Sequence, residues 1–253
     1  MRSLLIIFFG VCLSTFAEAQ PPVRNLPKAA VVIERATITS PMHSRRMLVL
    51  WMHNPKKNPT GYSADDIYTC PDATRGSYYS GPTRVSLINS ATGAIINTIK
   101  IGDDDDGFDL PYAIRKGNYY RVPARVAPTV EAKPNIMWLK DYNGDGRALE
   151  FALFEAEACM GLQTTLIGYS EKQDRVINYS IVIAVTEAGN HTEEVSTWAD
   201  YLFHEKPRQP GYWKYEIDYR GRGGSLDKWE VRYNAAKEQF EGARVSVTGN
   251  LEN

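Results

Sequence analysis

The stretch that decides the fold is residues 212–219, which read YWKYEIDY and alternate apolar with polar residues from Trp213 onward. A Gly-rich segment follows over 220–225, and then the run 228–233 (KWEVRY) alternates again. Successive side chains of a β-strand point to opposite faces of its sheet, so a period of two predicts strands with one buried face. The last third of the chain is therefore predicted to form an antiparallel hairpin.

Runs of the same kind recur toward the N-terminus, where they are rich in β-branched residues. The predicted strands occupy residues 29–38, 46–53, 83–89, 94–101, 119–122 and 136–139. Two further hairpins are predicted, one joining 83–89 to 94–101 through Gly93 and one joining 164–170 to 175–185 across the polar turn 171–174. Such spacing is typical of antiparallel β proteins.

Helical spacing is scarce by comparison. Residues 192–204 place Val195, Trp198 and Leu202 at i, i+3 and i+7, and 234–241 is a second short candidate. The predicted fold is therefore mainly β, an antiparallel β-sandwich-like or two-layer β architecture with one or two short helices.

Composition excludes some classes of partner. The 253 residues include 29 Lys and Arg against 30 Asp and Glu, a net charge of -1, and 43% are hydrophobic. Proteins that bind nucleic acid through its phosphates need a basic surface, and this balance argues against that class. The composition is that of a soluble globular protein.

The N-terminus has the three parts of a secretory signal peptide. Arg2 precedes an apolar run from Leu4 to Leu13, and Ala17-Glu18-Ala19 forms a small-residue cleavage site before Gln20. The predicted organisation is a signal peptide at 1–19, a flexible leader at 20–28 and a single large β domain at 29–253, with a sub-boundary near 123–134. The mature chain has no other apolar run long enough to span a membrane, so it is predicted to be secreted or periplasmic.

Two cysteines remain after cleavage, Cys70 and Cys159. Disulfides form in oxidising compartments, and two thiols allow one intramolecular bond. Closing this loop would stabilise the fold by about 4 to 5 kcal/mol in the chain-entropy model, less any strain. The alternative is a pair of buried free thiols.

One segment has the pattern of a cation site. Asp141, Asn143 and Asp145 place oxygen side chains at every second position, and Gly146 follows them. A hard cation such as Ca²⁺ takes six to eight oxygen ligands, and a tight turn at Gly146 would turn the carbonyl of Arg147 toward the same centre. The alternative is a plain Asn-Gly or Asp-Gly turn that needs these residues only for its backbone.

This segment resembles the D-x-N-x-D-G calcium loop of EF-hands, dockerins and bacterial integrin-like (FG-GAP) repeats. The resemblance implies that Asp141, Asn143, Asp145 and the Arg147 carbonyl bind Ca²⁺. It covers about ten residues and departs at its end, where Leu149 and Ala152 replace the acids of those families. Glu150 is the nearest substitute ligand, and a loop between predicted strands is closer to the integrin-like version.

The predicted function is a secreted, calcium-stabilised β protein that acts as a non-catalytic binding or surface-interaction module for carbohydrate or another protein. The ordered polar residues of the calcium loop include no nucleophile or general base. The alternative is an extracellular hydrolase of glycan or peptide with a carboxylate site that the sequence does not locate. Glu150, Glu155 and Glu157 lie close together, but the favoured explanation for them is a polar strand face together with one ion ligand.

Overall fold

The computed structural model describes residues 23–58, 78–101, 112–115, 136–157, 161–187, 189–195, 197–199 and 209–247. Side chains are described within 23–55, 81–101, 136–153, 165–186 and 209–247. Four predictions lie outside these residues: the signal peptide at 1–19, the strand at 119–122, the sub-boundary near 123–134 and the Cys70–Cys159 disulfide.

The strands form three large sheets and one small one. The N-terminal sheet has the order β1 (Ala30–Ile38), β2 (Arg46–His53), β5 (Thr83–Asn89) and β6 (Ile95–Ile101). In the central sheet, β9 (Gly161–Ser170) pairs with β8 (Glu150–Glu157) on one side and with β10 (Arg175–Asn178) and β13 (Thr197–Ala199) on the other. The C-terminal sheet has the order β12 (Gly189–Val195), β11 (Ile181–Glu187), β16 (Gln239–Val247), β15 (Leu226–Asn234) and β14 (Tyr212–Asp218). The small sheet contains β3 (Lys56–Asn58), β4 (Tyr78–Gly81) and β7 (Tyr112–Arg115).

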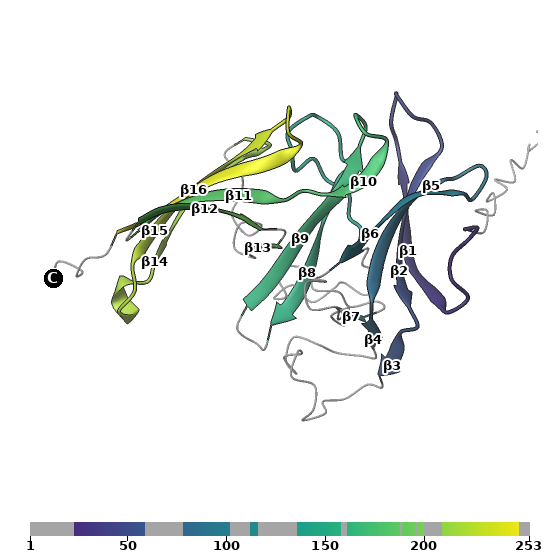
Figure 1. Ribbon diagram of the computed structural model, residues 1–253, viewed down its shortest axis with the longest axis horizontal. Helices are drawn as coiled ribbons and strands as arrows, with labels where there is room; N and C mark the ends of the chain where they lie inside the picture. Colours follow the sequence, from purple (N-terminus) through teal and green to yellow (C-terminus); the bar gives the residue numbers. More distant parts are fainter. Residues whose placement is uncertain are drawn as a thin grey trace, which may run out of the picture.

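The central sheet lies between the other two large sheets (Figure 1). Its strands alternate between two hydrophobic cores because successive side chains point to opposite faces. Phe151 and Leu153 pack with the N-terminal sheet, whereas Ala152 and Leu166 pack with the C-terminal sheet. The predicted β-sandwich-like architecture is confirmed, and the C-terminal sheet adds a further layer to it.

The N-terminal sheet is apolar on both faces. Leu48 and Leu50 of β2 face the central sheet, and the alternate residues Met47, Val49 and Trp51 form a separate cluster on the other face. Val23 and Leu26 pack against that outer cluster. Part of the segment predicted as a flexible leader therefore covers the outer face of this sheet.

The predicted helices are wrong in the described residues. Residues 192–195 belong to β12, which pairs with β11 from Ile181↔Val195 to Glu187↔Gly189, and 197–199 belong to β13. The candidate at 234–241 comprises the end of β15, the turn 235–238 and the start of β16. Pairing with neighbouring strands satisfies the backbone in both places and outweighs a weak helical spacing. The helix in the described residues is one 3-10 turn, Arg220–Arg222.

The predicted strand at 136–139 is also wrong. The carboxylate of Glu34, at a bulge in β1, accepts hydrogen bonds from the backbone N–H groups of Ile136 (2.7 Å) and Met137 (3.0 Å). A side chain thus replaces the strand partner of this segment. The segment is still buried, because Ile136 and Met137 enter the first core.

The predicted strand at 175–185 divides into β10 and β11. Between them the chain leaves the central sheet, where the Tyr179 N–H donates to the Leu166 carbonyl (2.8 Å), and joins the C-terminal sheet, where the Ser180 carbonyl accepts from the Phe240 N–H (2.9 Å). One predicted strand therefore becomes two, which belong to different sheets.

Candidate metal centre

The candidate loop, residues 141–149, is closed at its base by paired backbone hydrogen bonds. The Lys140 N–H donates to the Glu150 carbonyl (2.7 Å), and the Glu150 N–H donates to the Lys140 carbonyl (3.2 Å). Gly144 and Gly146 have φ of 82° and 85°, in the left-handed region that glycine adopts without strain. The loop leads directly into β8 at Glu150.

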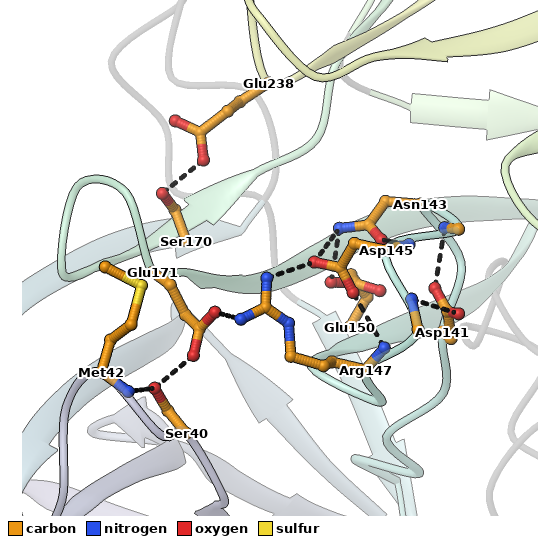
Figure 2. A network of polar contacts seen from close by, with 12 residues as sticks. Ser40, Met42, Asp141, Asn143, Asp145, Arg147, Glu150, Ser170, Glu171 and Glu238 are labelled. Atoms are coloured by element: carbon orange, nitrogen blue, oxygen red, sulfur yellow. Dashed lines mark hydrogen bonds and ion pairs between the residues drawn. The ribbon is translucent and has the colours of Figure 1, made fainter.

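Three side chains of the loop turn inward onto its own backbone (Figure 2). The Asp141 carboxylate accepts hydrogen bonds from the N–H groups of Gly144 (2.7 Å) and Gly146 (2.9 Å). Asn143 Oδ1 accepts from the Asp145 N–H and Asp145 Oδ1 from the Arg147 N–H, each at 2.9 Å. These contacts are what the plain turn interpretation expects, and they also hold the oxygens in fixed directions.

Glu150 is the residue that a plain turn does not explain. Its side chain turns back into the loop and is fully buried, at 0% exposure. Its carboxylate accepts hydrogen bonds from the Tyr142 N–H and from Asn143 Nδ2, both at 3.0 Å. Burial, and then the nearby charges of Asp145 and Asp141, raise the pKa of Glu150 to about 8.

In the part of the chain that the structure describes, no Lys, Arg or His side chain forms an ion pair with Glu150. A buried carboxylate is costly unless a proton or a cation neutralises it. With its raised pKa, Glu150 carries a proton at neutral pH unless a cation neutralises the carboxylate instead.

The amide of Asn143 lies where two carboxylates converge. Its Nδ2 donates to Asp145 Oδ2 (3.3 Å) and to Glu150 Oε1 (3.0 Å). A cation shared by these oxygens would take the place of the amide N–H groups, and a half-turn of the amide would present its oxygen as a further ligand.

Carboxylate, amide and carbonyl oxygens are the ligands of a hard cation, so the chemistry of the loop fits Ca²⁺. Within the described residues, no three His, Cys, Asp or Glu side chains are grouped so as to hold a metal ion. The carboxylates of Asp141, Asp145 and Glu150 therefore do not form a ready-made site, and binding would require them to rearrange around the ion together with Asn143 and the Arg147 carbonyl. That carbonyl accepts a hydrogen bond from the Leu149 N–H (3.1 Å).

The guanidinium of Arg147 connects the loop to the turn that follows β9. It lies between Asp145 Oδ2, 3.2 Å from Nη2, and the carboxylate of Glu171, with which Nη1 forms an ion pair (Figure 2). The side chain of Glu171 is only 5% exposed, and its other oxygen accepts a hydrogen bond from Ser40 Oγ. This contact links the loop to the end of β1 in the N-terminal sheet.

The loop also touches the C-terminal sheet, backbone against backbone. A Cβ on Gly144 would lie 2.6 Å from the Pro210 carbonyl oxygen, and a Cβ on Gly211 would lie 2.4 Å from the Asn143 carbonyl oxygen. Glycine is required at both positions for this approach. Tyr142 packs into the second core, and burial together with the charge of Glu150 raises its pKa to about 12. The loop is therefore placed where all three large sheets meet.

The turn 171–174 was predicted only as a polar turn, and its role in joining the sheets was missed. Asp174 accepts two hydrogen bonds from Arg46 (2.8 and 2.6 Å) and one from Tyr169 (2.8 Å). Glu238, between β15 and β16, accepts from Gln173 (2.7 Å) and from Ser170. Tyr169 is near Asp174 in the chain, but Arg46 and Glu238 are at least 65 residues from their partners in this turn, so no local sequence signal indicates them.

Other candidate residues fall outside what the structure describes. Glu155 and Glu157 belong to β8, where their side chains are not described, so the structure does not test the carboxylate pair of a hydrolase. Cys70 and Cys159 also lie outside the described residues, as does a second cluster of carboxylates in the sequence, residues 103–109 (DDDDGFD). Among the described residues no helix has the length and apolar character needed to cross a bilayer.

Comparisons of the chain with protein-family models, with curated proteins and with solved structures find no match.

Proposed function

We propose that this protein is a calcium-stabilised β protein whose function is non-catalytic binding outside the cytoplasm. The observation that carries the calcium part is Glu150, a fully buried carboxyl group that has no cationic partner among the described residues and faces a loop of oxygen side chains. Neutralising such a group from within the loop stabilises the fold at the meeting point of the three large sheets.

The ion would be held by Asp141, Asn143, Asp145, the Arg147 carbonyl and Glu150. The ion supplies charge and geometry rather than reaction chemistry in this role. The chain's own contribution is to orient the carboxylates through the N–H groups of Gly144, Gly146 and Arg147.

The binding part of the proposal rests on Trp138, just before the loop. This side chain is 54% exposed, and Lys140 Nζ lies 4.6 Å from the centroid of its ring. Exposed aromatic rings stack on the apolar faces of sugars, and a neighbouring ammonium donates hydrogen bonds to hydroxyl or carboxylate groups. Carbohydrate is therefore the partner that this surface favours, and another protein is the competing outcome.

Thermal melts test whether the protein binds Ca²⁺. Saturating Ca²⁺ is expected to raise Tm by about 5 to 10 °C over EDTA, since a ligand at about 100 times its Kd stabilises by about 2.7 kcal/mol. Asp145→Ala is expected to lose this shift. Asp218→Asn, a control at an exposed carboxylate paired with Arg220, is expected to keep it. Equal melting temperatures of the wild-type protein in Ca²⁺ and in EDTA would exclude the site.

Calorimetry with a panel of neutral and acidic oligosaccharides tests the partner. At least one is expected to bind with a Kd below about 1 mM, and Trp138→Ala is expected to weaken it tenfold or more. Tyr219→Ala, at an aromatic side chain that is 41% exposed in another part of the molecule, is the matched control. Failure of every oligosaccharide, or an unchanged Kd for Trp138→Ala, contradicts the carbohydrate assignment.

The proposal includes export through a signal peptide cleaved between Ala19 and Gln20 and a disulfide between Cys70 and Cys159. Mass spectrometry of the exported protein under non-reducing conditions is expected to find Gln20 as the first residue and a mass 2 Da below that of the dithiol form, about two hydrogens. Two free thiols would exclude the disulfide, and an intact residue 1 would exclude cleavage.

A further inference from the structure

We propose that the guanidinium of Arg147 is a built-in cation that competes with Ca²⁺ for Asp145, and that Glu171 holds the guanidinium when the ion is bound. This inference rests on the proposed calcium site and assigns the residue pair that regulates its affinity.

The two contacts of Arg147 with Asp145 have separate roles. The backbone N–H of Arg147 donates to Asp145 Oδ1 (2.9 Å), which orients the carboxylate. The side chain of Arg147 pairs with the other oxygen, Oδ2, at 3.2 Å. Asp145 Oδ2 also accepts the Asn143 amide, so it is the oxygen that faces Glu150 and the proposed ion position.

The guanidinium of Arg147 and a Ca²⁺ ion cannot both bind Asp145 Oδ2 at full strength. A divalent ion at Asp145 Oδ2 would repel a positive charge 3.2 Å from the same atom. Binding of the ion must therefore displace the guanidinium from Asp145 or share the oxygen at a cost in affinity. Arg147 thus lowers the affinity of the loop and neutralises Asp145 when the ion is absent.

Glu171 gives the displaced guanidinium a second partner. Its carboxylate already forms an ion pair with Arg147 Nη1, and its side chain is 5% exposed against 29% for Asp145. An ion pair in the less exposed position is screened less by water and salt. Ser40 Oγ holds the other oxygen of Glu171 in place. The guanidinium can therefore release Asp145 without losing its better shielded partner.

Two single substitutions at this pair have opposite expected effects on Ca²⁺ affinity. Arg147→Gln removes the competitor and is expected to lower the Kd for Ca²⁺ about fivefold, the upper range for one exposed ion pair. Glu171→Gln leaves the guanidinium with Asp145 alone and is expected to raise the Kd by a similar factor. In the double variant, which has no lone buried charge, the weakening by Glu171→Gln is expected to disappear because its cause, Arg147, is gone.

Two matched control variants distinguish competition for Asp145 from a general effect of changing the charge near the loop. Lys172→Gln removes a positive charge from the same turn, where Lys172 Nζ donates to the Ala236 carbonyl (2.9 Å). Glu238→Gln removes a negative charge that contacts Ser170 and Gln173. Neither side chain contacts the loop in these interactions, so both variants are expected to change the Kd less than twofold.

The experiment is calorimetric titration of the full chain with CaCl2, with circular dichroism in EDTA to confirm that each variant folds. If the wild-type protein does not bind Ca²⁺, the proposed calcium site is wrong and the inference falls with it. If the wild-type protein binds Ca²⁺ but Arg147→Gln has the same Kd for Ca²⁺ as Lys172→Gln, then Arg147 does not compete with the ion. The proposed calcium site is not affected by that result. If Arg147→Gln does not fold, the single and double variants at Glu171 decide: a weakening that persists in the absence of Arg147 overturns the inference.

Discussion

The loop 141–149 with Glu150 and the turn 171–174 contain acidic groups of the same kind in opposite electrostatic states. In the turn, each acid has an arginine: Asp174 pairs with Arg46 and Glu171 with Arg147. In the loop, the most deeply buried acid is Glu150, and the donors that it has among the described residues are neutral. The pKa of Asp174 is accordingly lowered, chiefly by Arg46, and the pKa of Glu150 is raised, chiefly by burial.

This difference shows how a structural cluster is distinguished from a candidate ion site. Acids that already have arginine partners stabilise the fold as they stand, and they join sheets whose contributing residues are far apart in the chain. A buried acid without a cationic partner is stable only with a proton or a bound cation. The number of carboxylates in each segment does not reveal this.

The largest loss of unfolding free energy is expected when the ion pair between Arg147 and Glu171 is broken. Glu171→Ala removes the partner of Arg147 and of Ser40 and is expected to lower the free energy of unfolding by about 3 kcal/mol, the lower end of the range for breaking a buried ion pair, because Arg147 is 38% exposed and keeps Asp145 as a partner. Urea denaturation in EDTA measures it. A loss below about 1 kcal/mol would place this pair with ordinary surface ion pairs and remove the contrast with Glu150.

The second prediction concerns Glu150, which has no arginine partner among the described residues. Between its ordinary pKa of 4.5 and the folded value of about 8, Glu150 binds more protons in the folded than in the unfolded protein. Stability in EDTA is therefore expected to fall as pH rises from 5 to 8, by up to about 3 kcal/mol.

Urea denaturation at a series of pH values measures this fall. Glu150→Gln is expected to remove it, and Ca²⁺ is expected to remove it in the wild-type protein because the ion favours the ionised carboxylate. A fall of the same size in Glu150→Gln would assign the pH dependence to other groups.

The smallest effect is expected at Asp174, where the sign is reversed. Its lowered pKa means that the ionised carboxylate stabilises the fold above its ordinary value of 3.8, and this stability is lost as pH falls below that value. Asp174→Asn is expected to cost about 1 kcal/mol at pH 7, as for a partly exposed pair, and to lose less stability on acidification. Acid titration followed by circular dichroism compares the variant with the wild-type protein. Identical acid transitions would show that Arg46 contributes nothing at this position.

The sequence predicted the strands well wherever one local pattern decided them. Residues 46–53 and 83–89 form strands with the predicted bounds, because alternating or β-branched runs identify their own conformation. Strand β16 is one that the sequence did not predict. It contains Gly242 and two charged residues, and it is stabilised by pairing in parallel with β11 and antiparallel with β15. The parallel pairing with β11 joins residues about 60 positions apart, which a local pattern does not encode.

The candidate site also has some features that the local sequence predicts and others that it does not. Its oxygen side chains and glycines were recognisable as a pattern, since their spacing within ten residues is itself the local geometry. The burial of Glu150, the approach of Pro210 and Gly211, and the contact of Arg147 with Glu171 were not. Each of these depends on a segment brought in from another sheet.

By itself, the sequence determined that this chain forms β-strands and that one short loop has the oxygens for a hard cation, because both properties arise from neighbouring residues. The tertiary structure alone decided that the strands form three stacked sheets and that the loop lies where these sheets meet. It also decided that Glu171 and Asp174 have arginine partners, whereas the buried Glu150 has none among the described residues. Burial and charge pairing are set by residues distant in the chain, and these two quantities decide whether a carboxylate stabilises the fold alone or needs a bound cation.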